Sequence, residues 1–104
     1  MNETVQDFAS FDDFYEFYLT EHSNRTNRRL HFIGSSAALL VAGVGLVTLQ
    51  PWLILPALVI GYAFAWVGHF FFEHNKPATF KYPWASFKGD WRMWRDIATG
   101  RIPF

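Results

Sequence analysis

A long apolar stretch dominates the hydropathy pattern of the chain. Residues 30–72 form 43 consecutive positions without Asp, Glu, Lys or Arg. A helix needs about 20 apolar residues to cross a bilayer, so this length matches two crossings joined by a tight turn. We expect the turn at Gln50–Pro51, between transmembrane helices over residues 31–50 and 51–73. Small residues recur every four positions on both segments, at Gly34, Ala38 and Ala42 and again at Gly61 and Ala65. Such faces allow close helix packing, so the pattern predicts a helical hairpin.

Amphipathic segments flank this stretch on both sides. Residues 10–22 open with Ser10 and Asp13 in a capping-box-like arrangement and then carry apolar side chains at spacings of three and four. That stripe consists of Phe11, Phe14, Tyr15 and Tyr18, and it ends at His22. Residues 84–98 mix aromatic with basic side chains, which is typical of a helix in the headgroup region. We therefore predict an all-α integral membrane domain over residues 1–104: a two-helix hairpin with interfacial amphipathic helices and a tail over 1–9.

Composition and charge exclude several classes of protein. The absence of cysteine rules out disulfides, thiolate metal ligands, iron–sulfur clusters and a nucleophilic thiol. A formal net charge of zero, without a basic cluster, argues against a nucleic-acid partner. The acidic N-terminal region has no apolar core of the kind found in cleavable signal peptides. Basic residues precede the first crossing and follow the second, whereas the turn is uncharged, so we expect both termini to be cytoplasmic.

Four histidines lie around one edge of the predicted hairpin. Crossings of about 28 and 27 Å would bring His31 and His69 to the same height. Antiparallel helices pack about 8–10 Å apart, close enough for two facing imidazoles to share one ion. His22 and His74 lie just outside the same edge. A polar turn over residues 23–29 is expected to let His22 and His31 face the same point.

These residue types favour a metal that activates oxygen. Glu73 follows His69 by four residues, so the two share a helix face. With His31 they make a two-histidine, one-carboxylate set, which suits non-haem iron(II). His22 would extend it to three histidines, with Glu73 as a fourth ligand or a catalytic proton acceptor. His74 can bind together with His69 only if the helix breaks between them. Asn24, Asn27 and Asn75 are natural hydrogen-bond partners for the imidazoles.

Two strings of residues carry a family resemblance. His22–Gly34 reads HSNRTNRRLHFIG, and Gly68–Ala78 reads GHFFFEHNKPA. In this order, with the hairpin between them, they resemble the Mpo-like family of membrane 2-hydroxy-fatty-acid dioxygenases. The likeness extends from about Phe14 to Trp94. The single hairpin is similar to the short bacterial form of that family, whereas eukaryotic members are longer.

The resemblance implies an activity and a set of site residues. In that family, iron(II) and molecular oxygen shorten a 2-hydroxy fatty acid by one carbon without 2-oxoglutarate. His22, His31 and His69 match the motif histidines, and Glu73 matches the acid that follows the last of them. His74 has no counterpart in the family, so its role as a metal ligand depends on geometry alone.

The implied substrate adds further expectations. Arg28, Arg29 and Asn27 are candidate substrate-binding residues, although topology and lipid phosphates explain the arginines equally well. The expected partners are the 2-hydroxy fatty acid, oxygen and membrane lipid, in the bacterial inner membrane. A two-helix hairpin has little area to enclose a fatty acid, so we expect a homodimer.

Three alternatives use the same histidines. A haem protein would ligate haem between His31 and His69 and show a Soret band. A non-catalytic membrane scaffold would use the histidines for packing or pH sensing and bind no stoichiometric metal. A zinc enzyme would use the same ligands, and the sequence does not separate zinc from iron.

Overall fold

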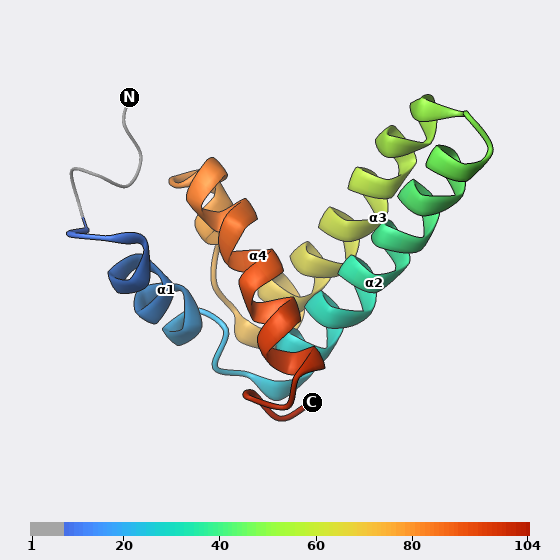
Figure 1. The fold of residues 1–104 in the computed structure, drawn as a ribbon. Coiled ribbons are helices and arrows are strands. Elements are labelled where there is room, and N and C mark those ends of the chain that lie inside the picture. Colours follow the sequence, from blue (N-terminus) through green and yellow to red (C-terminus); the bar gives the residue numbers. More distant parts are fainter. Residues whose placement is uncertain (1–7) are drawn as a thin grey trace.

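The computed structural model describes residues 8–104 and is all-helical over that range, which confirms the predicted fold class. Residues 1–7, most of the expected tail, lie outside the described part. The elements in order are α1 (Phe11–Thr20), α2 (Arg25–Val47), the short helix η1 (Pro51–Leu53), α3 (Ile54–Val67), η2 (Gly68–Glu73), η3 (Ala78–Phe80) and α4 (Pro83–Ala98). In Figure 1 the α2–α3 hairpin forms one arm of a V, and α1 with α4 forms the other.

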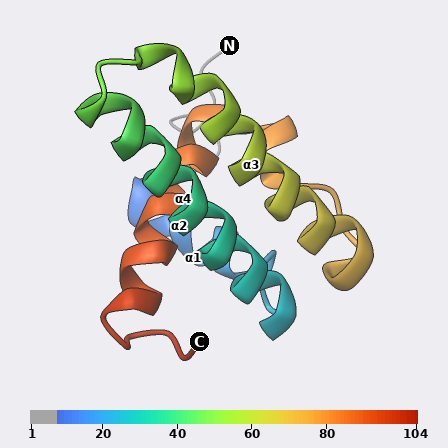
Figure 2. The same ribbon diagram turned by 90° about the vertical axis from the view of Figure 1, so that its right-hand side faces the viewer.

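The predicted hairpin and its small-residue contact face are confirmed. Helices α2 and α3 run antiparallel and side by side (Figure 2). A Cβ atom added to Gly34 would lie 2.5 Å from the Cβ of Phe64, so only glycine permits this approach. A Cβ added to Gly61 would lie 3.6 Å from the Cβ of Ala38, an ordinary packing distance. The backbone turns through Leu49, whose φ is 55°, immediately before the expected Gln50–Pro51 turn.

Helix α2 begins earlier than the sequence pattern suggested. The polar segment over residues 23–29 was expected to be a turn, but only its first two residues lie outside the helix, which starts at Arg25. The reason is an N-cap: the side chain of Asn24 accepts a hydrogen bond from the backbone N–H of Asn27 at 3.1 Å. The chain reversal is therefore confined to the few residues between Thr20 and Arg25.

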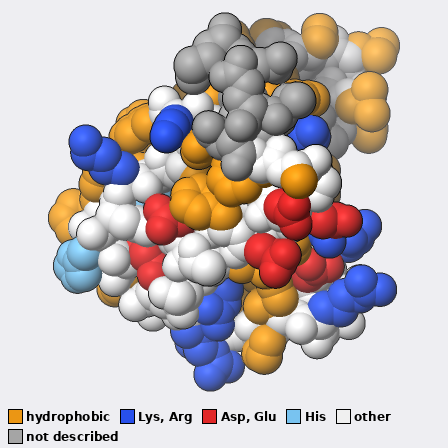
Figure 3. All heavy atoms as spheres, turned by 90° about the vertical axis from the view of Figure 1, so that its left-hand side faces the viewer, with side chains coloured by type: hydrophobic (Ala, Val, Ile, Leu, Met, Phe, Trp, Pro, Cys, Tyr) orange, Lys and Arg blue, Asp and Glu red, His pale blue; other side chains and the backbone are white. Residues whose placement is uncertain are grey.

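The two amphipathic helices pack against each other and build a small core. The predicted stripe on α1 is buried at Phe14, Tyr15 and Tyr18. It contacts buried residues of α4 and the segment before it, namely Tyr82, Ala85, Met93 and Ile97. Trp94 joins α4 to the hairpin by stacking on Phe32 and donating a hydrogen bond to Ser36 at 2.9 Å. Seen from the α1 side, charged side chains of both signs surround a limited apolar patch (Figure 3).

The hairpin has two helices long and apolar enough to cross a membrane, Arg25–Val47 and Pro51–Glu73. In the most apolar window of each, only 17% and 22% of residues are buried. The core helix of a water-soluble protein would be mostly buried, so the exposed apolar surface needs another covering.

Candidate metal centre

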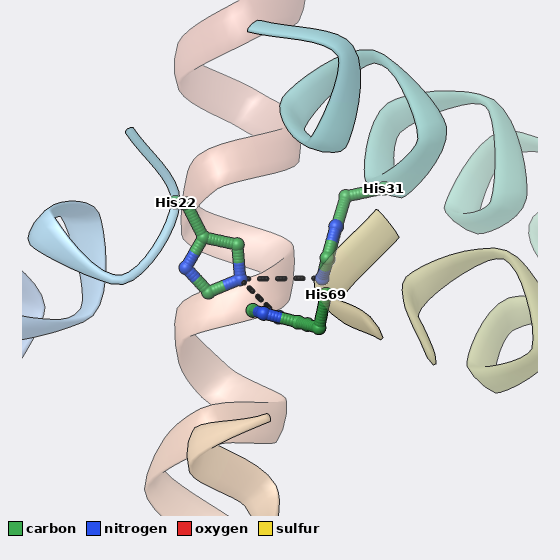
Figure 4. A group of neighbouring side chains, drawn as sticks. All are labelled: His22, His31 and His69. Carbon is green, nitrogen blue, oxygen red and sulfur yellow. Dashed lines mark hydrogen bonds between the residues drawn. The ribbon is translucent and has the colours of Figure 1, made fainter. Parts of the chain in front are cut away.

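Three histidines from separate segments meet at the vertex of the V. His22 follows α1, His31 lies in the second turn of α2, and His69 lies in η2. Figure 4 shows the three imidazoles pointing toward one another. The Nε2 atom of His22 lies 3.2 Å from that of His31 and 3.0 Å from that of His69. All three side chains are buried, with exposed fractions of 4% or less.

The outward nitrogen of each ring determines where its proton lies. The Nδ1 atoms of His22 and His31 lie 2.7 and 3.0 Å from the backbone carbonyl oxygens of Tyr18 and Asn27. A carbonyl oxygen only accepts, so both Nδ1 atoms carry the proton. Each neutral ring then directs a lone pair at Nε2 toward the other two.

In the third ring, that of His69, the proton also lies on Nδ1. His69 Nδ1 lies 2.7 Å from Asn75 Oδ1. The Asn75 amide is oriented by its own donation from Nδ2 to the carbonyl oxygen of Glu21 at 3.1 Å, so its oxygen faces the imidazole. The predicted support of an imidazole is thus confirmed for Asn75 and wrong for the side chains of Asn24 and Asn27, which cap α2 and bind Glu73 instead. His69 Nδ1 is therefore a donor, and its Nε2 lone pair also points inward.

Three converging lone pairs repel one another unless a cation lies between them. Burial, reinforced by the two neighbouring imidazoles, lowers the pKa of His22 well below its usual range, so protonation does not relieve the repulsion at neutral pH. Metal–imidazole bonds of about 2.1 Å allow ligand nitrogens up to about 4.2 Å apart, and the separations of 3.0 and 3.2 Å fall inside that limit. The ligand nitrogens of all three rings lie within 4.8 Å of one another, close enough for the cluster to hold a metal ion after a small movement of the rings.

A π-helical segment, η2, directs His69 into the cluster. The α-helical pattern changes at Gly68, where an added Cβ would lie 2.0 Å from the side-chain oxygen of Asn27. Glycine is therefore required for α2 and η2 to approach at this height. Short π-helical turns are frequent at functional sites because they redirect one side chain within a helix.

Glu73 lies at the end of η2, outside the cluster. Its carboxylate accepts hydrogen bonds from Ser23 Oγ at 2.7 Å and from the Asn24 backbone N–H at 2.9 Å. Asn27 Nδ2 donates a further bond at 3.0 Å. The carboxylate thus lies at the N-terminus of α2, where the helix dipole favours a negative charge. The structure does not bring it together with the three histidines.

The candidate substrate-binding residues are engaged by the protein itself. Arg28 donates to the carbonyl oxygens of His22 and Ser23, at 3.1 and 2.8 Å, and so holds the loop that carries His22. Arg29 donates to the carbonyl oxygen of Phe104 at 3.0 Å. Asn27 is fully buried and bridges Glu73 and His31.

His74, the fourth histidine, does not join the cluster. The helix ends immediately before it, and His74 has a left-handed backbone with φ 61° and ψ 41°. Its side chain is exposed.

A cavity opens beside the histidines toward α4. It is lined by all three imidazoles and by Tyr62, Ser86 and Asp90. It shares His31, Tyr62 and Asp90 with a second, apolar hollow that extends between the hairpin and α4 to Ala57 and Leu58. Polar groups thus line the cavity at the histidines, and mostly apolar groups line the neighbouring hollow.

Sequence reasoning missed Ser86 and Asp90. The sequence did contain a signal for them: these two polar residues lie four apart on the helix face that also contains the buried residues Gly89 and Met93. The hydroxyl of Tyr18 donates a short hydrogen bond to Asp90 Oδ1. Burial raises the pKa of Asp90 to about 7, against the opposing effect of that hydrogen bond.

The fold and the cluster together define a helical-hairpin protein with a buried cluster of three histidines, arranged as a metal ion would require, and an adjoining apolar hollow. Residues 8–102 match the family described as 2-hydroxy-palmitic acid dioxygenase Mpo1-like. The chain therefore belongs to the Mpo1-like family. Searches of curated proteins and of solved structures gave no match.

Proposed function

We propose that this protein is an iron(II)-dependent dioxygenase that shortens 2-hydroxy fatty acids by one carbon. The observation that carries the proposal is the convergence of three Nε2 lone pairs, each fixed by an acceptor on the opposite ring nitrogen. Family membership supplies the substrate class, since the family's description names 2-hydroxy-palmitic acid. His22, His31 and His69 would hold the metal, and His74, which lies outside the cluster, is left out of the proposed ligand set.

The proposed reaction balances without a further reductant. A 2-hydroxy acid and one O₂ give the acid one carbon shorter, carbon dioxide and water. The bond between C1 and C2 breaks, C2 is oxidised from an alcohol to a carboxyl group, and C1 leaves as carbon dioxide. These changes release four electrons, the number that reduces one O₂. Iron(II), when bound, would supply the oxygen-activating chemistry.

The residues of this chain would bind, orient and shield the reactants. The backbone oxygens of Tyr18 and Asn27 and the amide of Asn75 keep the three imidazoles in the tautomer that presents Nε2. The apolar hollow beside His31 is suited to an acyl chain, which would bring the polar head of the ligand to the histidines. Glu73 supports the site from the α2 N-terminus instead of acting as the proton acceptor.

The proposed location is the bacterial inner membrane, with the histidine cluster at the cytoplasmic edge. Exposed apolar side chains along the hairpin support membrane insertion. Basic residues that precede the first crossing and follow the second support a cytoplasmic location for both termini. The sequence has no cysteine, so a single Thr48→Cys variant places one thiol at the turn. Labelling of that thiol only from the periplasmic side is expected, and labelling from the cytoplasmic side would reverse the proposed orientation.

The proposed oligomeric state is a homodimer, which would add apolar surface around the substrate. Crosslinking in membranes tests it.

The activity is tested on protein purified in mild detergent and loaded anaerobically with iron(II). Adding 2-hydroxypalmitate should cause oxygen uptake and release the fifteen-carbon acid in equal amounts. The matched controls are zinc-loaded protein and the His31→Ala variant with iron added. No uptake by iron-loaded wild type would overturn the dioxygenase proposal, and turnover by the zinc form would favour the zinc enzyme.

The haem alternative is tested on the same sample. A haem held between His31 and His69 would need the porphyrin between the two rings. His22 Nε2 already lies 3.0–3.2 Å from both Nε2 atoms, so no such space is present. We expect no Soret band after haem addition. A stoichiometric Soret band would favour the haem protein.

A further inference from the structure

The face of α4 that borders the histidine cavity carries two polar groups whose roles are not explained by the metal centre. Ser86 has an exposed fraction of 2%, and its hydroxyl has no hydrogen-bond partner among residues 8–104. Leaving a buried hydroxyl without a hydrogen-bond partner destabilises the folded protein. Such a group therefore requires an explanation, and a ligand that completes its hydrogen bond is one.

Asp90 lies one helical turn after Ser86 and lines both the histidine cavity and the apolar hollow. Residues four apart on a helix have Cβ atoms about 5–6 Å apart, so both side chains can reach one small ligand head. Asp90 therefore lies between the cavity at the histidines and the apolar hollow.

The orientation of the Asp90 carboxyl is fixed by Tyr18. The Tyr18 hydroxyl donates to Oδ1, and no other hydrogen bond to this carboxyl is found within residues 8–104. An added Cβ at Gly89 would lie 2.9 Å from the Tyr18 ring, so glycine allows the ring to reach Asp90. The Tyr18 ring also stacks on His22, with centroids 3.9 Å apart. The carboxyl is thus held in a set position relative to the histidine cluster.

The two side chains offer complementary chemistry. A carboxylate accepts hydrogen bonds, and a serine hydroxyl can donate one. Ser86 also lies in the first turn of α4, the end of a helix that favours an anion. A ligand with a hydroxyl donor next to a carboxylate acceptor would satisfy both, and a 2-hydroxy acid has these groups on adjacent carbons.

We propose that Asp90 and Ser86 form the site on α4 that recognises the head of the substrate: Asp90 accepts the hydrogen bond of the 2-hydroxyl group, and Ser86 donates to the carboxylate. This inference rests on the proposed function, because it assumes a 2-hydroxy acid as the ligand. It assigns the discrimination between 2-hydroxy and unsubstituted fatty acids to Asp90. Ser86 would bind both kinds of acid equally.

The test measures binding, so that it is independent of turnover. Zinc-loaded protein is titrated under anaerobic conditions, so that no oxygen is present to consume the ligand, with 2-hydroxypalmitate and with palmitate in the same detergent. The readout is the ratio of the two dissociation constants. In Asp90→Asn, the Tyr18 hydroxyl keeps the amide oxygen, and the NH₂ group that replaces Oδ2 cannot accept from the ligand hydroxyl. We expect the wild-type preference for 2-hydroxypalmitate to fall by at least about tenfold in Asp90→Asn.

Asp96→Asn is the matched control. Asp96 lies on the same helix and accepts a hydrogen bond from Tyr15 at 2.7 Å, but it does not line the histidine cavity. Its substitution should leave the ratio within about twofold. Ser86→Ala removes an unpaired buried hydroxyl, so it should fold normally, and it should weaken binding of both acids by about fivefold while leaving the ratio unchanged.

The outcomes separate the inference from the proposed function. If wild type oxidises 2-hydroxypalmitate, but Asp90→Asn keeps the full preference or Ser86→Ala keeps full affinity, the recognition site is wrong and the dioxygenase stands. If iron-loaded wild type takes up no oxygen and the zinc form does not prefer the 2-hydroxy acid, both are wrong. Should Asp90→Asn fail to fold, the Ser86→Ala titration decides the inference by itself.

Discussion

The two ends of the hairpin place the same pair of helices in different surroundings. At the turn, Leu46, Val47 and Leu49 have exposed fractions of 78%, 82% and 86%. At the opposite end, Asn27 and His69 are at most 2% exposed and make directed hydrogen bonds. The turn end is thus held by backbone hydrogen bonds and close packing of small residues, and the vertex end by a network of polar side chains.

This difference indicates where the protein tolerates change. A transmembrane helix satisfies its own backbone, so apolar residues near the turn need only remain apolar. At the vertex, each buried polar group depends on a particular partner, and loss of that partner leaves an unsatisfied group. Substitutions of similar size should therefore have larger effects at the vertex.

The largest effect is expected from removing a histidine of the cluster. His31→Ala and His69→Ala each delete one of three Nε2 ligands, so neither variant should retain stoichiometric metal or oxygen uptake. His74→Ala is the matched control, because this exposed histidine lies outside the cluster. Elemental analysis after purification and dialysis provides the measurement. Normal metal content in His69→Ala, or loss of metal in His74→Ala, would show that the ligand set is wrong.

A smaller loss is expected when the support of one ligand is removed. Asn75→Ala deletes the acceptor of the His69 Nδ1 proton, which should weaken metal affinity by about 10–100-fold. Lys76→Ala, a change at the adjacent exposed residue, should leave the affinity unchanged. Competition with a fluorescent chelator measures both variants. Equal affinities would mean that Asn75 does not support His69.

Two glycines test the contrast between the ends directly. In Gly68→Ala the new Cβ meets the Asn27 side chain, so we expect a destabilisation of about 1–3 kcal/mol. In Gly43→Ala nothing lies within 4 Å of the new atom, and the better helix propensity of alanine should leave stability unchanged or slightly higher. Unfolding in mixed micelles compares them. An equal loss of stability in both variants would contradict the expected difference in tolerance between the two ends of the hairpin.

A variant of Glu73 distinguishes a structural role of this residue from a catalytic one. In Glu73→Gln, an NH₂ group replaces one acceptor oxygen facing Ser23 and Asn24, so stability should fall by about 1–2 kcal/mol. Metal content should stay near one ion per chain. If stability is retained and metal or turnover is lost, Glu73 acts in the chemistry, as its spacing from His69 first suggested.

A further prediction concerns the pH dependence of stability. The folded-state pKa of Asp90 is raised from 3.8 to about 7, so the folded protein keeps a proton that the unfolded chain releases. The stability this group contributes is present below about pH 4 and is lost as the pH rises through 7. Relative to Asp90→Asn, wild type should therefore lose stability between pH 4 and 7, although water at this partly exposed group reduces the effect. A constant difference in melting temperature over that range would contradict the raised pKa.

Sequence periodicity predicted much of the hairpin and the meeting of three histidines. The 43-residue apolar length predicted two helices of equal rise, and equal rise predicted that His31 and His69 lie at one level; their ring centroids are 4.9 Å apart. The stripe on α1 likewise predicted that Tyr18 and His22 share a buried face. These results depend only on the regular geometry of helices.

The features that periodicity did not predict depend on local breaks and on tertiary packing. Glu73 was placed beside His69 by α-helical spacing, but the π-helical segment and the free N–H groups of α2 draw it elsewhere. The helix break that His74 would need in order to bind a metal together with His69 does occur. However, His74 has a left-handed backbone, and its side chain is exposed. Ser86 and Asp90 line the histidine cavity because α4 packs on α1 and on the hairpin. The pattern of a single amphipathic helix does not specify this packing, so the sequence did not identify the two residues.

The most direct test of the metal centre is X-ray absorption spectroscopy of the iron(II)-loaded protein. Three imidazole nitrogens at about 2.1 Å, with multiple scattering typical of histidine, are expected in the wild type. His74→Ala should give the same spectrum. A first shell with fewer than three imidazoles, or a spectrum that changes in His74→Ala, would contradict the three-histidine centre.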